Sequence, residues 1–294
     1  MTYKLCPLSI EKLMPLFSSG TEVSDIIEKL KTYEGKKIKL RNLNPGYDFN
    51  INEKEAEFVL KQVVLKKQMS DLQYRLYAEG KKALLIVFQG IDTSGKDSTI
   101  RHVISAFNPQ SCVVKAFKEP TVEDLSHDFL WRIHKSTPAK GEIVIFNRSH
   151  YEDIIQPRVH KTIHKSIWIQ RYEHINAFER CLSDNSTKII KFFLYISKKE
   201  QRKRLEERLT DPSKQWKVSE RDIEDRKYWN RYIAAYQDII NKCSNLSAPW
   251  YIIPANKKWF RNLVVSLIIV DTLEKLKPKI PKPAMDLSRM VIDG

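Results

Sequence analysis

Residues 90–97 read GIDTSGKD and have the residue types and spacing of a phosphate-binding loop. The apolar run 83–88 precedes them, and residues 98–104 read as the first turns of a helix. Strand, glycine loop, lysine and helix form the context in which the GxxxxGK pattern binds phosphate. Glycines let the loop wrap closely, so that backbone N–H groups and the helix N-terminus face the anion. We expect phosphate to be held by the loop amides together with Gly90, Ser94, Gly95, Lys96 and Ser98.

Two carboxylates in this loop indicate a metal ion as well as phosphate. Asp97 occupies the position at which a Ser or Thr hydroxyl normally meets magnesium. Asp92 lies inside the loop, where its charge would repel phosphate unless it faces Mg²⁺ or an incoming phosphate acceptor. Carboxylate oxygens suit Mg²⁺, with Mn²⁺ as a substitute. Asp97 has an alternative role as a first-turn helix residue that the helix dipole stabilises.

A second polar cluster follows the apolar run 143–146. Residues 147–153 read NRSHYED, and ligands bind beyond the carboxyl ends of strands in open parallel sheets. Asn147 stands where many phosphate-loop enzymes carry a magnesium-binding aspartate. Arg148 could clamp a phosphate through two parallel hydrogen bonds, or form a surface ion pair. Glu152 could reach a metal or an acceptor, whereas His150 could serve either catalysis or structural hydrogen bonding.

A highly charged segment, 198–208, follows another apolar run and leads into residues 211–217. Arg202 and Arg208 are six residues apart and so do not share one stripe of a helix, but a segment that moves could bring both over a phosphate chain. Arginines stabilise the charge that spreads over a phosphoryl group during transfer, and closure keeps water out. The alternative is a solvated charged helix. We expect a helical lid at about 198–217.

These motifs lie between short apolar runs rich in β-branched and aromatic residues, as buried parallel strands are. The expected strands are Leu84–Phe88, Cys112–Phe117, Ile143–Phe146, Ile189–Ile196 and Trp250–Ile253. Helical patterns cover Gly95–Phe107, Val122–Lys135, Trp168–Ser183, Lys198–Thr210, Glu220–Cys243 and Lys257–Lys277. The alternation predicts an α/β fold with one doubly wound, five-stranded parallel sheet.

The two ends of the chain read differently from this core. Residues 1–50 look irregular, and a helical pattern from about Glu53 to Glu79 is expected to pack against the core. We therefore divide the chain into an N-terminal helical extension (1–80), a core that contains the lid (81–277) and a C-terminal tail (278–294). Prolines favour an extended conformation of that tail.

The net charge of +15 in 294 residues predicts a polyanionic partner or an acidic membrane surface. The four cysteines are far apart and lack metal-ligand spacing, which favours a reducing compartment. The N-terminus shows no signal-peptide pattern, and the apolar run 263–270 is too short to span a bilayer. We expect a cytoplasmic protein without a membrane partner.

Several ordered motifs together resemble the polyphosphate kinase 2 family over residues 35–277. Besides the loop at 90–97 they are NPQ at 108–110, KEPT at 118–121, FNRSHYE at 146–152, SKKEQR at 197–202, DP at 211–212, WK at 216–217, APWY at 248–251 and NKKW at 256–259. The resemblance implies a P-loop kinase-like fold with a lid. It also implies a Mg²⁺-dependent, reversible transfer of the terminal phosphate between inorganic polyphosphate and a nucleotide.

Carried onto this chain, the resemblance assigns roles to residues of those motifs. The catalytic residues would be Asp92, Lys96, Arg148, Arg202 and Arg208. The residues that contact phosphate or nucleotide would be Gly90, Ser94, Gly95, Asp97, Ser98, Lys118, Asn147, Glu152 and Lys217. Asp92 would orient magnesium and the acceptor phosphate, with Asp97 as the second metal ligand. Arg148 would bridge donor and acceptor.

The NRSHYE motif resembles the subgroup that uses AMP as well as ADP, and Glu152 would be part of that distinction. Many members carry an aspartate where this chain has Asn147. The resemblance favours adenine nucleotides, with guanine nucleotides as an alternative, and a homodimer or homotetramer.

Two other functions remain open from the sequence. One is an ATP-dependent nucleoside monophosphate kinase, against which the missing hydroxyl at Asp97 and the charge surplus argue. The other is a non-catalytic polyanion-binding protein, against which the set Asp92, Lys96 and Arg148 argues. No RNA-recognition motif or series of stacked aromatic residues indicates a nucleic acid partner.

Overall fold

The computed structural model describes residues 20, 22–61, 63–286 and 290. Within them, a six-stranded sheet has the order β1-β6-β5-β2-β4-β3. Its strands are β1 (Lys31–Thr32), β2 (Ala83–Gln89), β3 (Cys112–Ala116), β4 (Ile143–Asn147), β5 (Thr187–Tyr195) and β6 (Trp250–Pro254). The last five run parallel, which confirms the predicted parallel sheet, and β1 pairs antiparallel with β6 at the edge.

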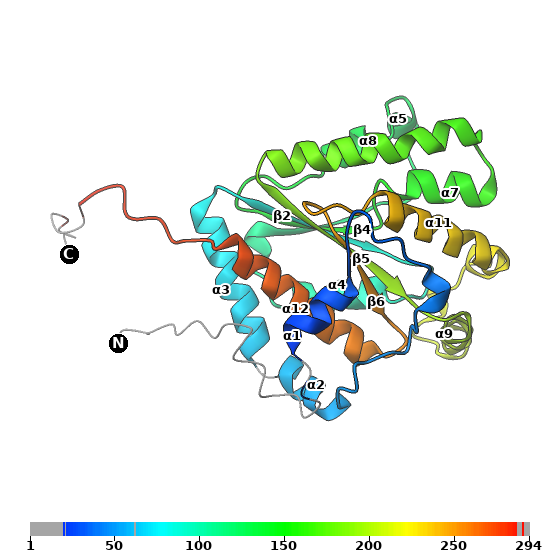
Figure 1. The fold of residues 1–294 in the computed structure, drawn as a ribbon, viewed down its shortest axis with the longest axis horizontal. Helices are drawn as coiled ribbons and strands as arrows, with labels where there is room; N and C mark the ends of the chain where they lie inside the picture. Colours follow the sequence, from blue (N-terminus) through cyan, green and yellow to red (C-terminus); the bar gives the residue numbers. More distant parts are fainter. Residues whose placement is uncertain (1–19, 21, 62, 287–289, 291–294) are drawn as a thin grey trace.

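Helices cover both faces of the sheet (Figure 1). On one face α12 (Lys258–Leu276) packs against α1 (Val23–Leu30), α2 (Glu53–Lys61), α3 (Val63–Glu79) and α4 (Lys96–Ile104). The other face carries α7 (Glu152–His160), α8 (Lys165–Asp184) and α11 (Trp229–Lys242), with α7 in contact with both of the others. This arrangement is the doubly wound α/β architecture that the alternation of strands and helices predicts.

The central position of β2 in the sheet explains why residues 83–88 form a continuous apolar run. All seven of its residues are buried, because the strand lies between two hydrogen-bonded neighbours and under helices on both faces. Leu84, Ile86 and Phe88 belong to the larger apolar cluster, which includes α12. Leu85 and Val87 point to the other face and pack in a smaller cluster with residues of α8. The phosphate-loop sequence therefore begins at the end of a rigid central strand.

Some predicted elements differ from those observed. Residues 1–50 contain α1 and β1, so the expectation of an irregular segment is wrong for residues 23–32, whereas residues 1–19 lie outside the described part. The helix expected at Val122–Lys135 consists of two single turns, α5 (Val122–Leu125) and α6 (Trp131–His134). The helix expected at Glu220–Cys243 is divided into α10 (Glu220–Asp225), a 3₁₀ turn (Arg226–Tyr228) and α11.

The expected lid segment begins with α9 (Lys198–Thr210) and continues through a 3₁₀ turn at Gln215–Lys217 into α10. Ser197 caps α9, since its hydroxyl accepts a hydrogen bond from the Glu200 N–H at 3.1 Å. Residues 278–286 of the expected tail contain neither helix nor strand. None of the helices in the described ranges combines the length and the apolar character that crossing a bilayer requires.

Candidate active site

The phosphate loop connects β2 to α4 and depends on two glycines. Gly90 and Gly95 have φ angles of +156° and +101°. A Cβ atom on Gly95 would lie 1.9 Å from Nη1 of Arg261, and one on Gly90 would lie 2.6 Å from Oγ of Ser94. The loop can therefore wind this tightly only with glycine at both positions. Gly95 is also the N-cap of α4, so the helix N-terminus opens toward the loop.

Lys96 is the buried cation of this loop. Its Nζ donates to the backbone oxygen of Gly90 at 2.6 Å, and its side chain lines the cleft described below. Burial lowers the pKa of Lys96, although the Asp92 carboxylate opposes that shift. The Asp92 carboxylate compensates the positive charge of this ammonium group only in part. A phosphate group in the cleft would supply further negative charge.

Arg204 of α9 holds the phosphate loop from the side of the lid. Its Nη1 donates to the backbone oxygens of Thr93 and Ser94, each at 3.0 Å. Its Nη2 donates to the backbone oxygens of Ala255 and Asn256 at 2.7 and 3.0 Å. The guanidinium group thus draws two carbonyl groups of the loop toward itself. The Ser94 N–H, which shares a peptide group with the Thr93 carbonyl, donates to the Ile91 oxygen at 3.0 Å. Because each peptide group carries its N–H opposite its C=O, the Gly95 N–H, which shares a peptide group with the Ser94 carbonyl, points away from Arg204 and can face an anion.

Arg261 of α12 supports the same loop. It is 1% exposed, and its Nη2 donates to Ser98 Oγ at 3.0 Å while Nη1 reaches the Ser94 oxygen at 3.4 Å. Burial, together with the neighbouring charge of Arg204, lowers the pKa of Arg261 to about 10. Two buried arginines therefore place positive charge directly beside the loop.

The polar cluster after β4 lies beside the phosphate loop, as expected from strand pairing. β4 is hydrogen-bonded to β2, with Phe88 opposite Asn147. Asn147 Nδ2 donates to Asp97 Oδ1 at 2.8 Å, and Arg148 Nη2 donates to Asp92 Oδ1 at 2.9 Å. Asn147 and Arg148, the first two residues of the second motif, thus each contact a carboxylate of the first.

The ion pair between Asp92 and Arg148 shifts the pKa of both side chains toward their charged forms. Burial would raise the pKa of Asp92, but Lys96 and Arg148 outweigh it and the pKa is lowered. Burial would lower the pKa of Arg148, but Glu152 and Asp92 outweigh it and the pKa is raised. Both groups are therefore charged at neutral pH, which excludes Asp92 as a general base of ordinary strength.

Glu152, the first residue of α7, lies next to this pair without lining the cleft itself. Gln156 donates to its Oε2 at 3.2 Å. With its amide oriented to suit both neighbours, Gln89 donates to Glu152 Oε1 at 2.9 Å and accepts from the Ser149 N–H at 3.1 Å. Glu152 is thus held by neutral amides, and its charge remains available to act on Arg148.

An open cleft of about 580 Å³ lies over these groups, between the phosphate loop, the end of β4 and the lid segment. Arg208 of α9 enters it and pairs with Asp222 of α10 at 3.5 Å. Trp216, which is 78% exposed, lies beside Lys217 on the lid side. The cleft is lined by Asp92, Thr93, Gly95, Lys96, Asp97, Ser98, Ala116, Phe117, Lys118, Asn147, Arg148, Arg208, Trp216, Lys217 and Asp222.

Ten of the predicted site residues are among these lining residues, and four are not. Gly90 and Ser94 lie in the base of the loop, where Ser94 is fully buried and its hydroxyl has no partner among the described residues. Glu152 does not line the cleft, although its charge acts on Arg148. Arg202 is 71% exposed and pairs with Glu206 of its own helix at 2.7 Å, so this structure does not bring it to the cleft.

Sequence reasoning missed three residues that contact the loop: Gln201, Arg204 and Arg261. Gln201 Nε2 lies 3.3 Å from the Asp92 backbone oxygen. Gln201, Arg204 and Leu205 are the buried residues of α9, and their i, i+3, i+4 spacing marks one inward face. Arg261 is a charge in the first turn of a helix, shortly before the apolar run 263–270. Only the position of Arg261 can be read from the sequence, because the inward face of α9 is set by how the helix packs.

Asp92 and Asp97 could bind a metal ion only if oxygen atoms of the substrate complete its ligands. No group of three or more His, Cys, Asp or Glu side chains gathers for a metal in the part of the chain that is described. Asp92 and Asp97 both line the cleft, and each has one oxygen engaged by a neighbour. Magnesium commonly binds through one or two carboxylates plus phosphate oxygens and water, and this donor set fits that habit.

Comparisons with known proteins agree with this geometry. The family described as Polyphosphate kinase 2 matches residues 51–281. A Meiothermus ruber protein named AMP/ADP-polyphosphate phosphotransferase is 50% identical over 230 residues, which are 78% of this chain and 86% of that protein. A Rhodopseudomonas palustris protein named ADP-polyphosphate phosphotransferase is 41% identical over 271 residues, which are 87% of this chain and 92% of that protein.

Solved structures give the same result. The crystal structure of Polyphosphate Kinase 2 from Arthrobacter aurescens superposes with a TM-score of 0.85 at 39% identity, covering 89% of this chain and 93% of that one. The matched residues span the phosphate loop, the β4 motif and the lid segment. The chain therefore belongs to the polyphosphate kinase 2 family.

Proposed function

We propose that this protein transfers the terminal phosphate of inorganic polyphosphate to AMP or ADP, reversibly and with magnesium. The observation that carries the proposal is the direct contact between the two motifs, Arg148 on Asp92, inside a cleft that also holds Lys96. Membership of the polyphosphate kinase 2 family and the names of the two relatives support it.

The charges of the cleft suit a polyanionic donor. Lys96, Lys118, Arg148, Arg208 and Lys217 line it, against the three carboxylates Asp92, Asp97 and Asp222. Cationic side chains on two opposite walls can follow a linear phosphate chain, and their attraction falls with salt because counterions are released on binding. The net charge of +15 acts in the same direction over the whole surface.

The side chains of the cleft can support in-line phosphoryl transfer. A terminal phosphate oxygen of the nucleotide attacks the terminal phosphorus of the chain, the bridging P–O bond breaks, and the shortened chain leaves with the electron pair. Lys96 and the loop N–H groups hold the transferred group, and Arg148 neutralises charge between donor and acceptor. Asp92 orients Arg148 and remains a carboxylate, because its pKa is lowered.

Magnesium, with manganese as a substitute, would be held by Asp92 and Asp97 together with phosphate oxygens. When bound, it supplies positive charge that neutralises the phosphate oxygens during transfer. Asn147 would keep Asp97 in place, since its amide occupies one carboxylate oxygen. Arg208, Trp216 and Lys217 would close over the donor as parts of a lid.

The acceptor would be AMP as well as ADP, with adenine preferred over guanine, and the protein would act as a dimer or tetramer. Glu152 is the residue to which we assign the choice of acceptor. It lies next to Arg148 and acts on its charge, so it can set how strongly Arg148 attracts a second acceptor phosphate. Arg202 would reach the donor only through movement of the lid, because it is exposed here.

A coupled assay tests the proposal. Purified protein is mixed with long-chain polyphosphate, Mg²⁺ and AMP, ADP, GMP or GDP, and product nucleotides are separated and quantified. We expect ADP and ATP from the adenine acceptors, none after EDTA, and recovery with added Mg²⁺ or Mn²⁺. Turnover with ATP and a monophosphate, but none with polyphosphate, would instead identify a nucleoside monophosphate kinase. Tight binding of polyphosphate without any turnover would identify a non-catalytic polyanion-binding protein.

A further inference from the structure

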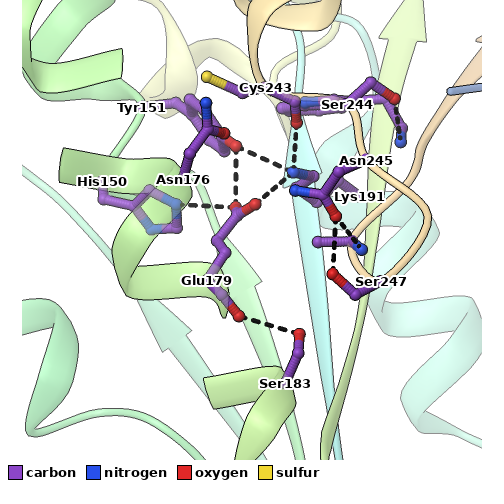
Figure 2. A network of polar contacts seen from close by, with 12 residues as sticks. His150, Tyr151, Asn176, Glu179, Ser183, Lys191, Cys243, Ser244, Asn245 and Ser247 are labelled. Atoms are coloured by element: carbon purple, nitrogen blue, oxygen red, sulfur yellow. Dashed lines mark hydrogen bonds and ion pairs between the residues drawn. The ribbon is translucent and has the colours of Figure 1, made fainter. Parts of the chain in front are cut away.

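A buried polar network is centred on Glu179 of α8 and Lys191 of β5 (Figure 2). Lys191 Nζ lies 2.5 Å from Glu179 Oε2, and both side chains are completely buried. The carboxylate also accepts from the Tyr151 hydroxyl at 2.8 Å and contacts His150 Nε2 at 3.2 Å. Lys191 further donates to Tyr151 Oη at 3.0 Å and to the Cys243 backbone oxygen at 2.7 Å.

The charges of this network depend on each other. Burial would raise the pKa of Glu179, but Lys191 and His150 outweigh it, so the pKa is lowered and the carboxylate is ionised. An ionised buried pair fixes its neighbours, because loss of either partner leaves an unpaired charge without water. His150 must carry its proton on Nε2 to donate to this carboxylate, and its Nδ1 has no partner among the described residues. None of the four side chains lines the cleft.

His150 and Tyr151 follow Arg148 closely in the chain, and Arg148 has an unusual backbone. Its φ angle is +62°, a left-handed conformation that residues other than glycine rarely adopt. Such a conformation persists only where the surrounding structure holds it. On the upstream side, the Arg148 N–H donates to the Phe88 oxygen at 3.0 Å. On the downstream side, the first side chains buried in a charged contact are those of His150 and Tyr151.

We propose that the Glu179–Lys191 pair positions Arg148. The pair anchors His150 and Tyr151, and this anchor keeps the Arg148 backbone in the left-handed conformation that presents its guanidinium group to Asp92, 2.9 Å away. Glu179 and Lys191 are thus positioning residues that act through Arg148. The kinetic part of the inference rests on the proposed function, in which Arg148 bridges the two phosphates.

A double-mutant cycle separates positioning from general stabilisation. Glu179→Gln is made alone and in an Arg148→Lys background, and kcat is measured well below the Tm of every variant. We expect Glu179→Gln alone to lower kcat at least tenfold. In the Arg148→Lys background we expect the same change to lower kcat by less than threefold, since the group that the network positions has already been altered. Equal factors in both backgrounds would overturn the proposal.

Two further variants guard against loss of folding. Tyr151→Phe removes only the hydroxyl that Glu179 and Lys191 share, and should show the same non-additivity with Arg148→Lys on a smaller scale. Leu76→Ala serves as the matched control, because this buried residue of α3 lies in an element that contributes nothing to the cleft. It should lower Tm while leaving kcat within twofold. A similar fall in kcat for Leu76→Ala would mean that loss of stability alone explains the Glu179 result.

The same cycle is read in the Kd of long-chain polyphosphate, followed by intrinsic fluorescence. This readout distinguishes the two proposals. Coupling between Glu179 and Arg148 in Kd, without turnover by the wild type, would overturn the proposed function and retain the positioning. Turnover by the wild type with additive effects in both kcat and Kd would retain the function and overturn the positioning.

Discussion

Arg204 of α9 donates from Nη1 to the backbone oxygen of Ser94 at 3.0 Å, which joins α9 to the phosphate loop. The contact is buried, since Arg204 is 6% exposed. It ties the first half of the expected lid, 198–210, to the loop that holds phosphate. Movement of the lid is therefore expected to be smallest at Arg204 and largest beyond Thr210, in the part that carries Trp216 and Lys217.

Arg204→Met should weaken the phosphate site and the fold together. The four backbone oxygens that Arg204 serves would lose this donor, although the Ser94 oxygen keeps Arg261 Nη1 at 3.4 Å, and an unsatisfied buried polar group costs about 1–3 kcal/mol. We expect kcat/KM for polyphosphate to fall at least about tenfold, which is roughly 1.4 kcal/mol of barrier. Arg204→Lys should rescue little, because a single ammonium group cannot replace a planar fork of donors. Steady-state kinetics and urea unfolding measure the two effects.

Lys203→Met is the matched control for Arg204. Lys203 is the preceding residue of α9, is 68% exposed and pairs only loosely with Glu207, at 3.9 Å. Its loss should change the free energy of unfolding by less than about 0.5 kcal/mol. If Arg204→Met kept kcat/KM within twofold of Lys203→Met, the loop would not depend on Arg204.

The charged run 198–208 also shows where sequence reasoning reaches its limit. Arg202 and Arg204 look alike in the sequence, yet one is in solvent and the other is buried under two loops. Which arginine faces inward depends on the rotation of α9 against the phosphate loop, and this rotation comes from tertiary packing. The contacts of Asp92 with Arg148 and of Asp97 with Asn147 are easier to predict from the sequence. They follow once β2 pairs with β4, because the polar residues that end these two parallel strands then lie at the same edge of the sheet.

The edge of the sheet shows a similar limit. β1 has two residues, Lys31 and Thr32, too few for any alternating pattern. It exists because Thr32 is hydrogen-bonded to Ser244 and to the Trp250 backbone, partners more than 200 residues away. In contrast, α1 could have been predicted, since Val23, Ile26, Ile27 and Leu30 have helical spacing and are all buried.

Asp92→Asn should lower kcat strongly while leaving the fold and polyphosphate binding largely intact. The change removes one charge at nearly constant shape, so Arg148 loses its ionic partner at 2.9 Å and magnesium loses a carboxylate. Single-turnover rates and a polyphosphate titration separate chemistry from binding. Activity within about tenfold of wild type, roughly 1.4 kcal/mol of barrier, would contradict the role given to Asp92. Asp271→Asn, which breaks an ion pair on α12, is the control and should leave kcat unchanged.

Lys96 should set an alkaline limit to activity below the usual lysine pKa. Lys96 must be protonated to attract phosphate, and burial lowers its pKa from 10.5. Since kcat/KM reports the free enzyme, its alkaline limb should be centred below 10.5. The limb of kcat should lie higher, because bound phosphate favours the charged form. A kcat/KM limb at or above the usual lysine value would contradict this.

The same shift predicts a sign for stability. Between the pKa of Lys96 in the folded chain and its higher value in the unfolded chain, the unfolded state binds more protons. The contribution of Lys96 to the free energy of unfolding therefore rises with pH across that window. Comparing the wild type with Lys96→Met by urea unfolding at several pH values isolates this contribution. The free energy of unfolding of the wild type, relative to that of Lys96→Met, should increase as pH rises. A decrease over this pH range would contradict the lowered pKa.

Glu152→Gln should shift acceptor preference from AMP toward ADP. The Glu152 carboxylate compensates part of the positive charge of Arg148. Replacing this carboxylate with a neutral amide therefore leaves Arg148 with a stronger attraction for the additional phosphate of ADP. The glutamine retains the shape and one acceptor oxygen for Gln89 and Gln156. The ratio of kcat/KM for ADP to that for AMP should rise at least about fivefold, roughly 1 kcal/mol of difference between the two transition states. Asp153→Asn, a change at the next residue, which pairs with Arg132 and does not line the cleft, should leave the ratio unchanged. A ratio that stays the same in Glu152→Gln would remove Glu152 from the choice of acceptor.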